Sequence, residues 1–174
     1  YFKEYLCVGG LPDVVNVFNL THDLMQVREI QKSILESYKD DFGKHLNKDE
    51  VQEINQTELT KIMQVYKSIP NQLAEENKKF QYKLVASNAK ARSHSNAITW
   101  LEEFGLICKC HNLNNLELPL DGNKDEDTFK IYVTDTGLFV AMLEEGTVDN
   151  IINGDLKVYK GAIFENIIAD AFNK

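Results

Sequence analysis

Residues 93–111 read SHSNAITWLEEFGLICKCH, and this stretch decides the fold. Its apolar side chains recur at the spacing of one helical face: Ala97, Ile98, Leu101 and Phe104. Gly105 follows as a helix stop, and residues 106–111 then have the composition of a β-strand. The stretch therefore predicts a helix over 93–104 that buries one face and leads directly into a strand.

The chain downstream predicts the partner of that strand. Within residues 128–134 the apolar side chains of Phe129, Ile131 and Val133 alternate with Lys130 and Tyr132, as in a half-buried strand. A long polar loop over 112–127 joins the two segments. We therefore expect an antiparallel hairpin.

The chain upstream predicts two further helices. Residues 51–68 have the 3.6-residue period of an amphipathic helix. Pro70 either ends this helix or opens a short one over 71–77. Helix, short helix, helix and hairpin is the order of a winged helix-turn-helix, whose third helix reads DNA and whose hairpin is the wing. The predicted fold class is mostly α with a small antiparallel β-hairpin, a winged helix-turn-helix flanked by helices.

The flanks are also predicted to be helical. Thr21 or Asp23 caps a helix that begins at Leu24 and ends within the polar residues 40–48, and Thr136 caps a short helix through Leu143. A last helix carries one wide apolar stripe, Ile163, Phe164, Ile167, Ile168, Ala171 and Phe172. Because the chain begins at Tyr1, we expect a piece of a longer protein, in which this stripe packs on a further domain rather than back on the core.

Composition excludes several classes of protein. The chain has 174 residues, 43% of them hydrophobic, and a net charge of −8. The longest apolar run, Leu138–Leu143, is far shorter than the ~20 residues of a membrane span, so we expect no membrane partner. The three cysteines do not form a disulfide framework, which predicts a cytoplasmic location.

Charge is distributed unevenly along the chain. Residues 77–101 contain five basic side chains and no acidic one, whereas the other 149 residues carry a net charge of −13. The contrast falls on the predicted reading helix and the turn before it, whose outer face offers donors and acceptors for phosphates and base edges. The candidate DNA-binding residues are Lys78, Lys79, Lys83, Lys90, Arg92, Ser95, Asn96 and Thr99.

The predicted wing opposes this interpretation. Its loop carries five carboxylates against the single Lys124, a net charge of −4 that a phosphate backbone would repel. Glu102 and Glu103 have the same effect on the end of the reading helix. A solvated basic face and a pure protein-interaction module therefore remain alternatives to DNA binding.

No catalytic or metal site is predicted from the residues. The chain has no phosphate-binding loop of the Gly-x-x-x-x-Gly-Lys-[Ser/Thr] type. In a strand, Cys108 and Cys110 share one face while His111 points away, so small buried apolar cysteines are a better account than zinc. Glu126 stands where a calcium loop needs glycine, which argues against calcium.

Several motifs in order resemble one family over nearly the whole chain. YLCVGGLPDVV (5–15) resembles the segment that ends the AAA-type module in a family of predicted prokaryotic ATPases, and YKDDFGKH (38–45) is similar to its next motif. The most specific match is SIPNQLAEENKKF (68–80). It is followed by WLEEFGLI (100–107), PL (119–120), FKIYVTDTGL (129–138) and GAIFEN (161–166).

The resemblance implies an architecture and a parent activity. It implies the end of an ATPase module and a connecting helix in 1–48, a winged helix in 49–145, and a linker with the first helix of a nuclease-like domain of the PD-(D/E)XK type in 146–174. Glu165 matches the acidic residue of that helix, although one carboxylate without its metal partners does no chemistry. ATP and Mg²⁺ are implied for the parent protein, and no cofactor is expected in this segment.

Two hypotheses about function follow. In the first, the winged helix belongs to an ATP-dependent AAA-type protein and contacts double-stranded DNA weakly. In the second, it docks on the ATPase module of the same chain or on another subunit, with no role in nucleic-acid binding. A free-standing nuclease would require residues that the chain lacks, so no enzymatic activity is expected of this segment.

Overall fold

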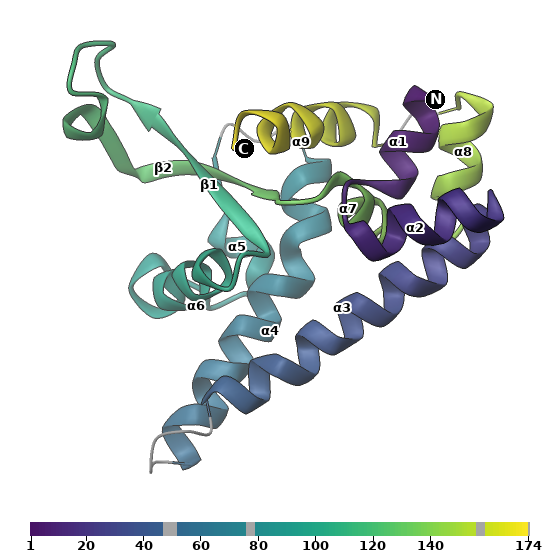
Figure 1. Ribbon diagram of the computed structural model, residues 1–174. Helices are drawn as coiled ribbons and strands as arrows, with labels where there is room; N and C mark the ends of the chain where they lie inside the picture. The colour runs from purple at the N-terminus through teal and green to yellow at the C-terminus, as the bar shows by residue number, and fades with distance from the viewer. Residues whose placement is uncertain (47–51, 76–78, 156–158, 174) are drawn as a thin grey trace.

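The computed structural model describes residues 1–46, 52–75, 79–155 and 159–173, with side chains except at 43–46 and 52–55. The described chain is mostly helical with one two-stranded antiparallel sheet (Figure 1), as predicted. Its elements are α1 (Phe2–Val8), α2 (Pro12–Thr21), α3 (Leu24–Leu46), α4 (Gln52–Ala74), α5 (Tyr82–Val85), α6 (Ala91–Glu103), β1 (Ile107–Leu113), the 3₁₀ helix η1 (Leu120–Asn123), β2 (Lys124–Val133), α7 (Thr136–Met142), α8 (Thr147–Asn153) and α9 (Lys160–Phe172).

Helix α6 is the centre of the fold. Ala97, Ile98 and Leu101 are buried on the side that packs against α4, as the spacing predicted. Phe104 is half-buried, and its ring lies across the edge of Phe42 from α3. The order α4, α5, α6 and hairpin is compatible with a winged helix, which remains an interpretation.

The short helix of this unit lies at α5, not at 71–77 as predicted. Helix α4 runs through Pro70 without ending, and Ile69 and Leu73 on either side are buried. Burial of this apolar turn offsets the hydrogen bond that proline cannot donate. The Gln72 side chain then holds the segment before α5, because it donates to the Gln81 carbonyl at 2.8 Å and accepts from its N–H at 2.9 Å.

The hairpin is longer than predicted. The register pairs Ile107 with Val133 and runs to His111 opposite Phe129. After an irregularity between His111 and Asn112, pairing resumes and extends to Leu113 opposite Lys124. The predicted polar loop is therefore mostly ordered as strand and as η1, and the arm projects from the body (Figure 1).

The N-terminal glycines join α1 to α7. The Asp135 side chain accepts from the Gly10 N–H at 2.6 Å and from the Leu138 N–H at 2.8 Å. Asp135, and not Thr136, is thus the cap of α7. Neither α1 nor α2 was predicted from the sequence.

Helix α3 begins as predicted but runs past Gly43. Asp23 caps its start, since Asp23 Oδ1 accepts from the Met25 N–H at 2.8 Å. The helix ends at Leu46, inside the polar segment where we expected an end.

Helix α9 docks on the core with half of its predicted apolar stripe. Ile163 is fully buried, whereas the side chains of Ile168 and Phe172 are 55% and 88% exposed. The expectation that the stripe packs on a further domain and not on the core is therefore wrong for the N-terminal part of the stripe, which contains Ile163. One hydrophobic cluster joins Leu6, Ile98 and Ile163. The division into three domains stays a prediction.

No helix among the described residues combines the length and the hydropathy that are needed to cross a membrane.

Candidate functional site

The outer face of α6 carries the residues that were predicted to contact DNA. Arg92, Ser95, Asn96 and Thr99 are all exposed, opposite the buried face of the helix. Lys90 is the N-cap residue and is exposed as well. The helix therefore presents one polar face to solvent, as its spacing predicted.

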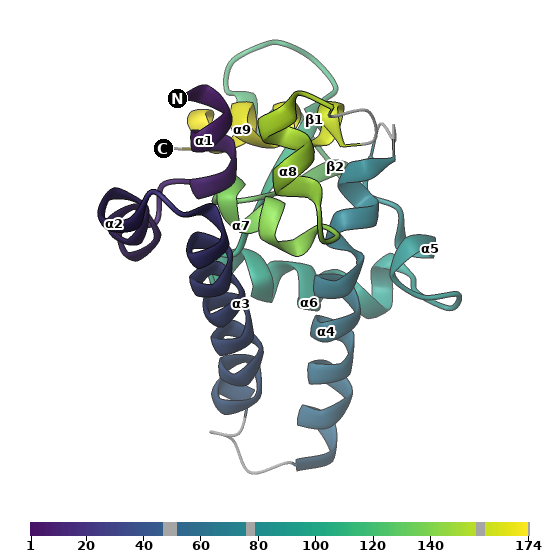
Figure 2. The ribbon, with the colours of Figure 1, turned by 90° about the vertical axis from the view of Figure 1, so that its right-hand side faces the viewer.

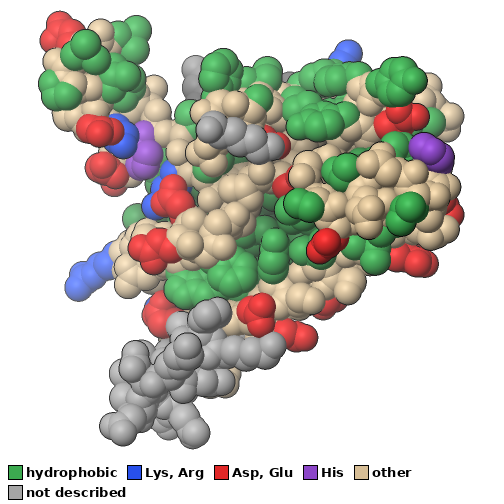
Figure 3. Space-filling view, viewed as in Figure 1, with side chains coloured by type: hydrophobic (Ala, Val, Ile, Leu, Met, Phe, Trp, Pro, Cys, Tyr) green, Lys and Arg blue, Asp and Glu red, His purple; other side chains and the backbone are tan. Residues whose placement is uncertain are grey.

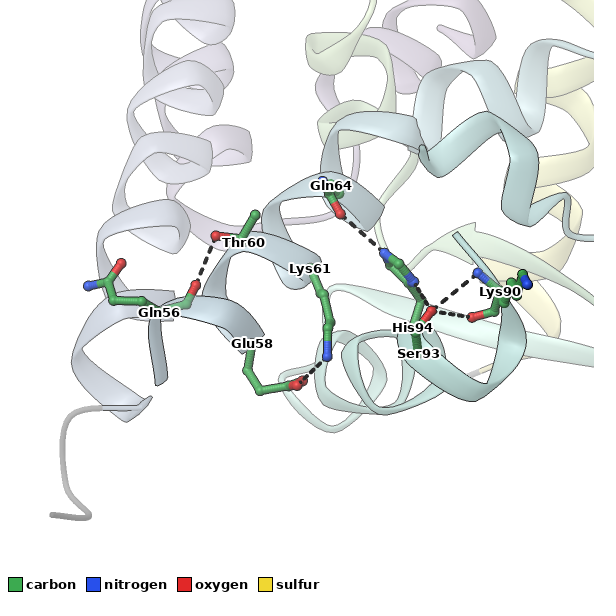
Figure 4. Close-up of polar contacts among 8 residues, drawn as sticks. All are labelled: Gln56, Glu58, Thr60, Lys61, Gln64, Lys90, Ser93 and His94. Carbon is green, nitrogen blue, oxygen red and sulfur yellow. Dashed lines mark hydrogen bonds and ion pairs between the residues drawn. The ribbon is translucent and has the colours of Figure 1, made fainter. Parts of the chain in front are cut away.

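A polar network fixes the start of α6 against α4 (Figure 4). The buried His94 ring lies with Nδ1 2.8 Å from Ser93 Oγ and with Nε2 3.1 Å from Gln64 Oε1 of α4. Ser93 Oγ also donates to the Lys90 carbonyl at 3.0 Å and accepts from the Lys90 N–H at 3.3 Å. Ser93 thus caps α6 through the Lys90 backbone, and the His94–Gln64 contact ties this end of the helix to α4.

The basic residues differ in their surroundings. Lys79, Lys83, Lys90 and Arg92 are exposed, and Lys78 lies outside the described residues. Among the described residues, no carboxylate forms an ion pair with Lys83, Lys90 or Arg92. The neighbouring Lys61 of α4 is paired with Glu58 at 2.6 Å (Figure 4) and adds no free cation.

Lys79 lies close to the acidic hairpin. The pKa of Asp125 is lowered mainly by a hydrogen bond from Thr128, and the charge of Lys79 contributes to that shift. Burial raises the pKa of Tyr82, and the charge of Asp127 raises it further. The hairpin carboxylates therefore reduce the positive potential at the α5 end of the basic segment.

The C-terminal half of the α6 face is occupied by a lysine from the hairpin. Lys109 Nζ lies 2.7 Å from Glu102 Oε2 and donates to Thr99 Oγ1 at 3.2 Å. Thr99 is thus exposed but already bonded, and its predicted role in base contact is weakened. Lys109 was missed because β1 and α6 meet only in the folded chain. The free part of the face is Arg92, Ser95 and Asn96, with Lys83 and Lys90.

The tip of the hairpin is both acidic and apolar. Leu116, Leu118 and Leu120 are 88%, 87% and 47% exposed. The space-filling view shows hydrophobic and acidic side chains together on the projecting arm (Figure 3). Asp121 pairs with Lys124 at 2.6 Å, which lowers the pKa of Asp121 and raises that of Lys124. The sequence predicted the acidity of this loop but not the exposed leucines.

Glu165 is engaged with β2. Its Oε2 accepts from Lys130 Nζ at 2.7 Å and from the Tyr132 hydroxyl at 3.2 Å. Burial and the charge of Glu165 raise the pKa of Tyr132. The described residues contain no group of three or more His, Cys, Asp or Glu side chains that could hold a metal. Glu165 therefore acts here as an ion-pair partner that holds α9 on the hairpin.

The cysteines lie in three different environments. Cys7 is buried, and burial raises the pKa of its thiol to about 12. Cys108 is half-buried, and Cys110 is exposed in the pair position opposite Lys130. The prediction of small buried apolar side chains concerned Cys108 and Cys110. It holds only in part for Cys108 and is wrong for Cys110, because both line the open hollow beside α9.

One family model matches the chain. It is described as a domain of unknown function, DUF8612, and it matches residues 1–149, which include α6 and the whole hairpin but not α9. Neither a curated protein nor a solved structure gives a significant match. Because the match covers most of the chain, the protein belongs to the DUF8612 family.

Proposed function

We propose that this chain is the winged-helix module of an ATP-dependent AAA-type protein and that α6 makes weak contact with double-stranded DNA. One observation carries the proposal: Arg92, Ser95 and Asn96 stand exposed on a helix whose other side is buried. A guanidinium and an amide are suited to phosphates and to base edges in the major groove. ATP and Mg²⁺ would be bound by other parts of the parent protein.

The contact is expected to be weak. Lys79, Lys83, Lys90 and Arg92 are the basic candidates without an ion pair among the described residues. Because Lys79 lies beside the carboxylate of Asp125, about three phosphates can be neutralised. The acidic hairpin would lie near the same backbone and oppose binding. A specific complex would therefore need the rest of the parent protein.

Replacing Lys90 and Arg92 together by glutamate is expected to weaken binding to duplex DNA at low salt at least about tenfold, because two attractive contacts become repulsive. The measurement is a fluorescence anisotropy titration of a labelled duplex. A double variant with the same charge change, Lys3→Glu with Lys160→Glu on α1 and α9, should bind like the original protein. Unchanged binding by the Lys90/Arg92 variant would remove α6 from the proposed interface.

A second candidate function is favoured by the hairpin tip. Leucines this exposed on an acidic arm are typical of a surface that another protein covers. In this alternative the module docks on the ATPase module or on another subunit, with no role for nucleic acid.

If the alternative holds, adding the parent's ATPase segment in trans should raise the melting temperature of this chain, whereas duplex DNA should not. Replacing Leu116 and Leu118 by serine should abolish the rise and leave the melting temperature of the chain alone unchanged, because both side chains are solvated. Asn115→Ser in the same exposed loop is the matched control. A rise that survives the leucine replacements would show that the hairpin tip is not the docking surface.

A further inference from the structure

A concave surface lies between α3, α4 and α7, on the side of the molecule that faces the viewer in Figure 2. This groove has a volume of about 490 Å³. Its apolar lining is formed by Leu35, Tyr66, Pro70, Ala141 and Met142, and three lysines stand around it, Lys32, Lys39 and Lys67. Buried Arg28 of α3 donates to the Leu143 carbonyl at 2.9 Å, which fixes the end of α7 beside the groove.

The groove has a surplus of positive charge. Lys39 is paired with Glu36 at 2.5 Å, and Lys32 with Glu145 at 3.3 Å. Lys67 is exposed and forms no ion pair within the described part of the chain. An apolar surface with an unpaired lysine at its rim is complementary to an apolar tip that carries carboxylates.

A second apolar hollow lacks this property. It lies beside α9, has a volume of about 470 Å³ and is lined by Cys110, Ile168 and Phe172 among others. Lys109 and Glu165 at its edge are already paired, with Glu102 and Lys130. Charge therefore directs an acidic arm to the α3–α4–α7 groove and not to the hollow beside α9.

The hairpin and the groove lie on opposite sides of the molecule. In Figure 1 the arm projects to the left, and the groove belongs to the right-hand side, which Figure 2 turns toward the viewer. A hairpin therefore cannot reach the groove of its own chain, but it can reach that of a second copy. Such a contact joins two different surfaces, so it extends head to tail until the rotation closes a ring.

We propose that the hairpin tip of one copy docks in the α3–α4–α7 groove of a second copy. Leu116 and Leu118 cover the apolar lining, and the exposed carboxylate of Glu117, which lies between them in the sequence, faces Lys67. The proposal deepens the interaction-module candidate above, on which it rests, by naming the partner. It accounts for solvated leucines that the isolated chain does not bury.

Sedimentation velocity over a concentration series tests the contact. The original protein should form dimers and larger species, and both Leu116→Ser/Leu118→Ser and Lys67→Glu should weaken self-association at least about tenfold. Asn115→Ser in the hairpin and Lys83→Glu outside the groove are the matched controls and should associate like the original. All four variants change exposed side chains, so their melting temperatures should agree as dilute monomers.

Mixing the two defective variants gives the most specific result. The leucine variant retains an intact groove and the Lys67 variant an intact hairpin, so together they should form a 1:1 dimer that grows no further. The proposal would be overturned if the original protein stayed monomeric up to about 1 mM, because a stable contact has a lower dissociation constant than that. It would also be overturned if the mixture of the two variants stayed monomeric. If either of these results is found and the leucine replacements still abolish stabilisation by the ATPase segment, only the second-copy inference fails and the interaction-module candidate stands.

Discussion

Replacing Gly137 by alanine is expected to lower the free energy of unfolding by about 3 kcal/mol, the upper part of the range for overpacking a core. A Cβ atom at this position would lie 2.5 Å from the Val8 carbonyl oxygen and 2.6 Å from its carbon. These are backbone atoms at the crossing of α1 and α7, so no flexible side chain can move aside. Urea denaturation followed by circular dichroism measures the change.

Gly161→Ala is the matched control for this prediction. Gly161 lies in α9, and a Cβ there would meet nothing within 4 Å. The same substitution should therefore stabilise the protein by about 0.5–1 kcal/mol, since alanine is the better helix former. Equal effects at the two positions would contradict the close approach of α1 to α7.

Replacing Asn166 by alanine is expected to cost about 3 kcal/mol, because it leaves buried backbone groups without partners. The Asn166 side chain is fully buried. Its Oδ1 accepts from the Val133 N–H at 2.8 Å, and its Nδ2 donates to the Val133 carbonyl at 3.0 Å and to Thr136 Oγ1 at 3.2 Å. Asn166 thus pairs with the edge of β2 as a neighbouring strand would.

Chemical denaturation measures the free energy of unfolding of Asn166→Ala and of Asn173→Ala. Comparing the two separates the loss of the Asn166 hydrogen bonds from the effect of the substitution on helix propensity. Asn173 is exposed at the end of the same helix, and its replacement should change stability by less than about 0.5 kcal/mol. A small loss for Asn166→Ala would mean that α9 is not held by this amide, and the position of Glu165 beside Lys130 would then lose its main support.

The parts of the fold that were predictable depend on local pattern. The face of Ala97, Ile98 and Leu101 and the alternation in β2 bury side chains at fixed periods, so both elements were identified correctly. Pro70 is a local helix breaker, but burial of Ile69 and Leu73 in the folded chain keeps α4 helical through it. The short helix therefore lies at α5 and not directly after Pro70. Helices α1 and α2 are too short for a period to show, and α1 lies against α7, which is far away in sequence.

The candidate site was predictable in its charge but not in its contacts. The basic segment and the acidic loop could be counted directly from the sequence. The bond between Lys109 and Thr99 forms across two elements, and no sequence spacing encodes it. The exposure of Leu118 follows from pairing that continues beyond the irregularity at His111, which a pattern of polar loop residues does not indicate. The links to an AAA-type parent and to a nuclease-like domain stay predictions.

The salt dependence of duplex binding tests the central claim, that α6 is a small cationic DNA-contact surface on an acidic body. With Lys83, Lys90 and Arg92 as the contacts, log Kobs against log[salt] should fall with a slope of about −3 or shallower, and Lys90→Glu with Arg92→Glu should flatten it further. Absence of binding at the lowest salt, or a slope steeper than about −5 that the double variant leaves unchanged, would contradict the account.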